Sequence, residues 1–223
     1  MKNHGGRATL ALVVLFAALP TSLALGQAVE TPAPTSDEEG FAAMQRRVVG
    51  VVSAIIDYSR DVRLTEPGLE AVLDHHDSLG EIYDDGDASR LVERAFVDGR
   101  YDFGAIVSDP SYVSWSRERG LEPEGFFRQL LRLQAVRMRE ESLSGLDEAR
   151  EEMPEQRAAL EQMREQMGEE QYRRTVAGLE SAAAMVEETR ALMEGLPVPT
   201  PAEAAILASQ DERIRATLGD GSE

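Results

Sequence analysis

Apolar residues recur at spacings of three and four along most of the chain, and this pattern predicts a succession of helices. The first series runs from Phe41 to Ile56, and the second runs from Leu69 to Tyr83. Such spacing places the apolar side chains on one face of a helix and the polar side chains on the other. Residues 98–108 fit no pattern clearly, and no convincing strand is found elsewhere. The pattern therefore predicts an all-α protein.

Several of the expected helices begin at recognisable caps. Thr65 stands two residues before Pro67, and Asp109 stands directly before Pro110. Residues 200–203, Thr-Pro-Ala-Glu, form a capping box with proline at the first helical position. A hydroxyl or carboxylate accepts hydrogen bonds from the free amides of the first turn, where proline is tolerated. We expect a helix to begin directly after each of these three caps.

Aromatic residues indicate where the core lies. Seven of the eleven that follow residue 26 stand between Phe96 and Phe127. Aromatic side chains bury the largest area per residue, so this segment is expected to form the core. The alternative is that these rings line a ligand groove. The helix expected after Pro123 is apolar over a wide arc, which predicts a central position for it.

A long amphipathic segment follows the expected core. Its apolar positions keep a strict 3-4 alternation from Leu146 to Met167, and they resume out of phase after Gly168. Sustained 3-4 spacing is typical of a long coiled-coil-like helix or of a helical pair. Pro154 should bend this helix, and the phase slip predicts a break, a kink or a turn at Gly168. The expected fold class is a helical bundle with a long amphipathic, coiled-coil-like C-terminal helical arm.

The first residues read as a secretory signal peptide. Lys2 and Arg7 precede an apolar run of 12 residues, 8–19, and Ala24 and Gly26 have the spacing that signal peptidase requires. A membrane span needs about 20 apolar residues, so cleavage is favoured over anchoring. We expect an exported protein, periplasmic or extracellular, with no membrane span after cleavage.

The expected division of the chain follows from these patterns. It comprises a signal peptide at 1–26, a linker at 27–37, a helical core at 38–142, long amphipathic helices at 143–195, and a proline-rich link with a C-terminal helix at 196–223.

The charge balance limits the possible partners. The formal charge of −18 becomes −20 when Lys2 and Arg7 are removed with the signal peptide. Phosphate groups bind clustered cations, so nucleic acid is excluded as a partner, whereas a basic partner fits. The chain has no cysteine, and it therefore has neither disulfides nor thiolate metal ligands.

The second expected helix contains the sequence LDHHD, residues 73–77, and its histidines raise the question of a metal site. A helical projection at 100° per residue places His76 on the apolar face and His75 at the edge of that face. Chelation along a helix needs ligands three or four residues apart, and no carboxylate has that spacing from either histidine. We therefore expect no metal site and no cofactor, with His76 a hydrogen-bonded core residue and His75 a boundary residue.

The acids of the same helix form a separate surface, which we call the acidic stripe. It consists of Glu70, Asp74, Asp77, Glu81 and Asp84. The plain interpretation is a solvated face that keeps the protein soluble. The functional interpretations are a docking strip for arginines of another helix, a basic partner, or a hard cation such as calcium. The acidic stripe is our candidate binding site for a partner or a cation.

One short segment carries a resemblance. Residues 153–167, MPEQRAALEQMREQM, resemble the Leu-Thr-x-x-Gln helix starts of the small periplasmic helical proteins related to the chaperone Spy. Pro154, Glu155 and Gln156 match that form, whereas Glu152 and Met153 replace its Leu-Thr pair. In that family such helices form a cradle for unfolded clients, and some relatives sense metals.

These observations favour a binding protein over an enzyme. The sequence contains no G-x-S-x-G elbow, no phosphate-binding P-loop and no H-E-x-x-H motif. We expect a non-enzymatic exported protein that binds a protein or peptide partner in the cell envelope, as an adaptor or chaperone. The alternative is a periplasmic cation-responsive sensor that uses the acidic stripe.

Overall fold

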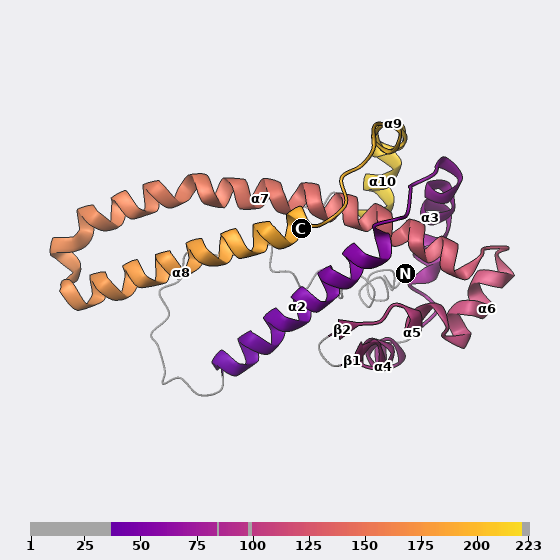
Figure 1. Cartoon of the computed structure of the whole chain (residues 1–223), viewed down its shortest axis with the longest axis horizontal. Helices are drawn as coiled ribbons and strands as arrows, with labels where there is room; N and C mark the ends of the chain where they lie inside the picture. The colour runs from indigo at the N-terminus through magenta and orange to yellow at the C-terminus, as the bar shows by residue number, and fades with distance from the viewer. Residues whose placement is uncertain (1–36, 84, 98–99, 220–223) are drawn as a thin grey trace, which may run out of the picture.

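The structure is a computed structural model that describes residues 37–83, 85–97 and 100–219. Figure 1 shows a helical body from which two long helices extend side by side. The expected signal peptide and nearly all of the expected linker lie outside the described residues. Within those residues, no helix has the length and apolar character needed to cross a membrane.

The described elements are almost all helices, and the predicted all-α class is confirmed. In chain order they are α2 (Asp37–Ser59), α3 (Glu66–Leu79), α4 (Asp85–Ala95), β1 (Phe96–Val97), β2 (Arg100–Tyr101), α5 (Gly104–Val107), α6 (Pro110–Glu118), α7 (Pro123–Met167), α8 (Glu169–Glu194), α9 (Pro201–Ser209) and α10 (Asp211–Leu218). The two short strands form one antiparallel pair within the segment whose pattern was ambiguous.

The three predicted caps are confirmed. The Thr65 hydroxyl accepts from the amide of Gly68, and the Asp109 carboxylate accepts from the amide of Ser111. Thr200 and Glu203 form the reciprocal bonds of a capping box.

The core lies where the aromatic residues predicted it. Tyr101, Phe103, Tyr112, Trp115, Phe126 and Phe127 are all buried. Phe127 is in contact with three other rings, at centroid distances of 6.1 Å to Tyr58, 5.6 Å to Phe103 and 5.8 Å to Tyr112. Because α7 supplies Phe127, the first half of α7 is the central helix, as its wide apolar arc indicated.

The long segment is a helical pair, and α7 also belongs to the body. Gly168, at φ +77°, ends α7 and precedes α8, so the phase slip marks a turn between antiparallel helices. Pro154 lies inside α7 without ending it, and it is exposed. The division expected at residues 142 and 143 falls in the middle of α7. We call the outer part of the pair, residues 146–190, the arm.

Arginines of α7 attach the C-terminal segment to the body. Arg139 donates to the carbonyls of Met193, Glu194 and Leu196 at 2.6–3.1 Å, and it thereby satisfies the free carbonyls at the end of α8. Arg137 donates to the carbonyl of Gly219 at 2.9 Å. These bonds fix the chain beyond α8 against the middle of α7.

Candidate functional site

The acidic stripe lies on the solvent side of α3, as the helical projection predicted. Glu70, Asp74, Asp77 and Glu81 are exposed, and Asp84 lies outside the described residues. Glu70, Asp74 and Asp77 lie on α3, whereas Glu81 lies beyond the end of the helix at Leu79.

One residue of the acidic stripe already binds an arginine. Asp74 forms an ion pair with Arg213 of α10, a residue 139 positions further along the chain. Helix α10 packs against α3 at this point, and Ile214 next to Arg213 is buried. The acidic stripe therefore docks a helix of its own chain through an arginine.

The histidines of α3 face away from the acidic stripe. His76 is buried, and the ring of His75 meets Trp115 edge-on at 6.3 Å. His76 differs from our expectation in one respect, because its buried Nδ1 has no hydrogen-bond partner within the described chain. The nearest acid oxygen is Oδ1 of Asp77, at 3.5 Å. Among the described residues, no three histidines or acids are grouped so as to hold a metal ion.

The ion pairs that join the middle of the two helices of the arm lie along one side, which we call the ion-pair face. Arg150 and Glu187 are 3.6 Å apart, Arg157 and Glu180 are 3.9 Å apart, and Arg190 pairs with Asp147. Each pair joins α7 to α8 and fixes their antiparallel register. Their side chains are mostly exposed, so each pair contributes little stability.

The arm has more acids than arginines. Residues 146–190 contain 12 acids and six arginines, a formal charge of −6. All six arginines form ion pairs with acids. In the described chain, Glu148, Glu151, Glu152 and Glu155 take part in none of the ion pairs, and all four are exposed. The outer surface of the arm is therefore a second region of uncompensated negative charge.

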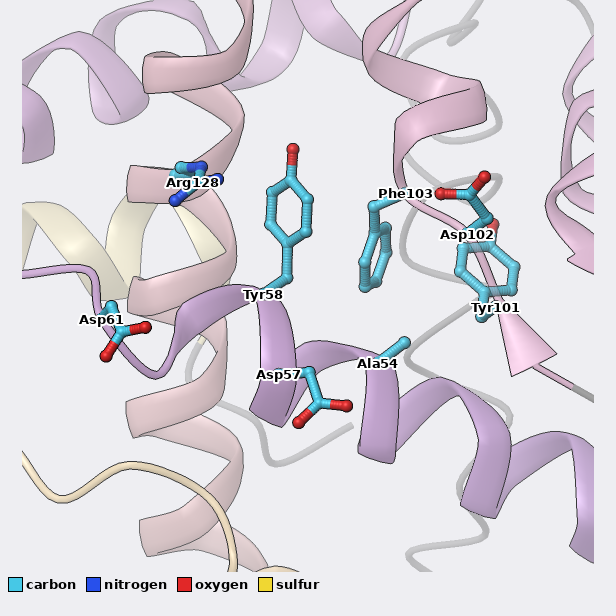
Figure 2. A pocket seen from close by; sticks show the side chains of 8 residues that line it. All are labelled: Ala54, Asp57, Tyr58, Asp61, Tyr101, Asp102, Phe103 and Arg128. Carbon is cyan, nitrogen blue, oxygen red and sulfur yellow. The ribbon is translucent and has the colours of Figure 1, made fainter.

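A pocket of about 330 Å³ lies between the end of α2, the β2–α5 turn and α7 (Figure 2). We call it the aromatic–carboxylate pocket. It is lined by Ala54, Asp57, Tyr58, Asp61, Tyr101, Asp102, Phe103 and Arg128. Figure 2 shows Tyr58 between Arg128 on one side and Phe103 on the other, with Asp57 and Asp61 extending from the α2 side.

The arginine of this pocket is paired with an acid, whereas one of the carboxylates of the pocket is not. Arg128 lies over the Tyr58 ring at 5.0 Å and binds Glu124 at 2.9 Å, so its charge is already compensated. Burial raises the pKa of Tyr58, and the charge of Glu124 raises it further, so this hydroxyl stays protonated at neutral pH. Asp61 forms no ion pair within the described residues. Carboxylates beside aromatic rings are a suitable environment for a cationic side chain.

The most buried charged residues of the described chain had not been singled out from the sequence. Arg132 of α7 and Glu203 of α9 form a two-pronged ion pair, with Nε–Oε1 at 2.8 Å and Nη2–Oε2 at 2.9 Å. Glu203 also accepts from the amides of Leu64 and Thr200, each at 2.8 Å. Burial raises the pKa of Glu203, but the bonds from Arg132 and these amides outweigh burial and lower the pKa to about 2.

This buried pair is structural in character, because all of its partners are groups of the same chain. It joins the end of α2, the start of α3 and the start of α9 to the first half of α7. The sequence contained two signals for this pair. One is the arginine inside the apolar run LLRLQAV, and the other is the glutamate of the predicted capping box. A buried arginine requires a carboxylate partner, but the sequence does not say which of its 41 acids supplies it.

Comparison with protein-family models, with curated proteins and with solved structures found no match.

Proposed function

We propose that the protein is an exported, non-enzymatic helical protein that binds a basic protein or peptide partner in the cell envelope, as an adaptor or chaperone. The observation that carries this proposal is the contact between Arg213 and Asp74. It is an example, within the chain, of an arginine-bearing helix docked on the acidic stripe. Glu70 and Glu81 remain exposed.

Two further features support a cationic partner. The aromatic–carboxylate pocket offers exposed carboxylates at Asp57 and Asp61 next to the ring of Tyr58. An arginine or lysine of a partner gains there from the charge and from the ring face together. The formal charge of −20 that follows from removal of the signal peptide also accelerates the approach of a basic protein from a distance.

The proposal is tested by site-specific cross-linking in the native cell envelope. A photo-reactive residue is placed at Asp77, on the acidic stripe, and at Glu151, on the arm, in separate variants. Both positions are exposed acids, so the two variants lose the same charge. We expect a discrete protein adduct at position 77 and none at position 151. Adducts at both positions, or at neither, would contradict binding at the acidic stripe.

The charge requirement is tested in the same experiment. Glu70→Gln with Glu81→Gln removes two charges from the acidic stripe, and Glu148→Gln with Glu155→Gln removes two from the arm. We expect the first pair to abolish the adduct at position 77 and the second to leave it. The chaperone version additionally requires that the purified protein suppress aggregation of an unfolded client.

The alternative, a cation-responsive sensor, has no comparable geometric support in the described residues. It would require a large shift in melting temperature on addition of calcium or zinc, reversed by a chelator. We expect no such shift.

A further inference from the structure

Helix α10 occupies part of the surface that we propose for a partner. Its Arg213 forms the ion pair with Asp74 of the acidic stripe. The neighbouring residue, Ile214, is buried and belongs to the hydrophobic core of the body. Figure 1 shows α10 next to α3, with which it packs. The contact therefore combines a charge with an apolar anchor, as in the binding of an amphipathic helix to a groove on another protein.

Helix α10 uses only one of the carboxylates that α3 offers. Glu70 and Asp77 stand four and three residues from Asp74, so the three carboxylates lie on successive turns of α3. In the described chain neither Glu70 nor Asp77 pairs with an arginine, and the side chain of Asp77 is 92% exposed. The second arginine of α10, Arg215, pairs with Asp211 of α10 itself. Two of the three carboxylates are therefore left for a more basic helix.

Few contacts hold α10 on the body. Among its described residues Ile214 is the one that is buried, and Leu218 is partly buried against the core. The side chain of Arg213 is 42% exposed, and such an ion pair contributes little stability. Arg137 donates one hydrogen bond to the carbonyl of Gly219 at 2.9 Å. The docking of α10 therefore depends mainly on its two apolar side chains.

Helix α10 is joined to α9 by a single residue, Gln210. This residue belongs to neither helix, and its backbone angles, φ −116° and ψ 10°, depart from helical values. On the other side of Gln210, α9 is fixed independently by the buried pair between Glu203 and Arg132. Gln210 is thus a hinge about which α10 leaves α3 while α9 and the body keep their contacts.

We infer that α10 is a displaceable occupant of a docking place on α3, and that the ligand of this place is an amphipathic helix with several arginines. The inference rests on the proposed function, because it takes the acidic stripe as the binding surface. Arginines three or four residues apart match the spacing of the carboxylates of α3. In contrast, the positions at this spacing from Arg213 are uncharged; they are Ser209, Gln210, Ala216 and Thr217. A helix with one arginine gains no more than α10 does, so α10 selects against it.

Competition with α10 gives the effect a definite sign. The apparent affinity for the ligand is reduced by the fraction of molecules in which α10 is undocked. A substitution that weakens the docking of α10 should therefore tighten ligand binding by the same factor. If α10 were instead part of the binding surface, the same substitution would weaken binding.

Two arginines of α10 provide matched variants for the test. Arg213→Gln breaks the ion pair with α3, whereas Arg215→Gln breaks the ion pair with Asp211 inside α10. Both arginines are exposed, and both substitutions remove one positive charge from the same helix. Ile214→Ala removes the apolar anchor and is the stronger variant. All three are made in the full exported chain. Amide hydrogen exchange of α10 measures its undocking in each, because a helix of eight residues is not stable alone in water.

The probe is a fluorescently labelled synthetic helix of about 15 residues that carries three Arg-Ile pairs at 3-4 spacing. A control peptide of the same length carries one such pair. Fluorescence anisotropy gives the dissociation constant of each peptide. We expect Arg213→Gln to tighten binding of the probe about two- to fivefold, Ile214→Ala at least about tenfold, and Arg215→Gln less than about 1.5-fold. The control peptide should bind the unmodified protein at least about tenfold more weakly than the probe.

Unchanged or weaker binding of the probe to Arg213→Gln and Ile214→Ala overturns the inference, because α10 would then not compete. Equal effects of Arg213→Gln and Arg215→Gln overturn it as well, since the change would reflect net charge alone. Slow exchange of α10 in all three variants would show that α10 is not displaceable. These outcomes are distinct from a failure of the proposed function, which the absence of an adduct at position 77 in the native envelope would show.

Discussion

The two halves of α7 carry arginines in opposite settings. In the first half, the side chain of Arg132 is 1% exposed, and it binds Glu203, the carbonyl of Val198 and the carbonyl of Ser59. In the second half, the side chain of Arg157 is 63% exposed, and its one ion pair is with Glu180 at 3.9 Å. Both are arginines paired with a glutamate across a helix interface.

The difference shows that the surroundings of an ion pair, more than its presence, set its contribution to stability. The first half of α7 contacts α2, α3, α5 and α6, whereas the arm packs mainly against α8. Water is excluded from the first setting and screens the charges in the second. Removing one partner of a buried pair leaves an uncompensated charge, but removing one partner of an exposed pair leaves a solvated one.

The strongest test of this comparison is Arg132→Leu. The substitution leaves Glu203 buried and charged without its main partner, and it should lower the free energy of unfolding by about 3–5 kcal/mol. Arg157→Leu is the control, and its expected cost is below about 1 kcal/mol. Urea denaturation followed by circular dichroism measures both. Equal losses would show that the two settings do not differ as described.

Acid titration tests the same pair without changing the interior. The pKa of Glu203 is lowered from 4.5 to about 2 in the folded protein. A lowered folded-state pKa contributes stability that is present above the unfolded value and is lost as the pH falls through the folded value. We expect a loss of about 3 kcal/mol between pH 4.5 and pH 2. Glu203→Gln should remove this part of the pH dependence, and an unchanged acid profile in that variant would contradict it.

Local signals predicted most of the fold. Caps at Thr65, Asp109 and Thr200 marked helix starts because such signals act within a few residues of each other. The 3-4 series and its slip at Gly168 gave the long helices and their turn, because a glycine with positive φ can end a helix. The single acidic face of α3 also followed from helical geometry alone.

Tertiary contacts could not be predicted in this way. Arg132 and Glu203 are 71 residues apart, and Arg213 and Asp74 are 139 residues apart. Periodicity assigns a face to each residue but does not choose its partner. The aromatic–carboxylate pocket likewise combines residues of α2, the β2–α5 turn and α7, whose proximity depends on the packing of the whole body.

A leucine from each half of α7 extends the comparison to apolar packing. Leu131 is fully buried in the body, and Leu160 is buried between the two helices of the arm, with 7% exposure. Leu131→Ala should cost about 4 kcal/mol, since a rigid surrounding keeps the cavity open. Leu160→Ala should cost about 2 kcal/mol, because the two helices can close around it. Denaturation midpoints decide this, and a larger loss at Leu160 would identify the arm as the better-packed half.

The smallest expected effect is a difference in how salt changes the stability contributions of the two ion pairs. Arg157→Gln removes the exposed pair with Glu180, and its expected cost at low ionic strength is about 0.5 kcal/mol. At about 1 M salt the screening length falls to about 3 Å, so this cost should vanish. The cost of Arg132→Leu should stay nearly constant over the same range, because bulk ions do not reach Glu203, which is 1% exposed. Paired denaturation curves at low and high salt measure both dependences. If the two costs fell in parallel, water and ions would have to reach both pairs alike, and the contrast between the halves of α7 would be lost.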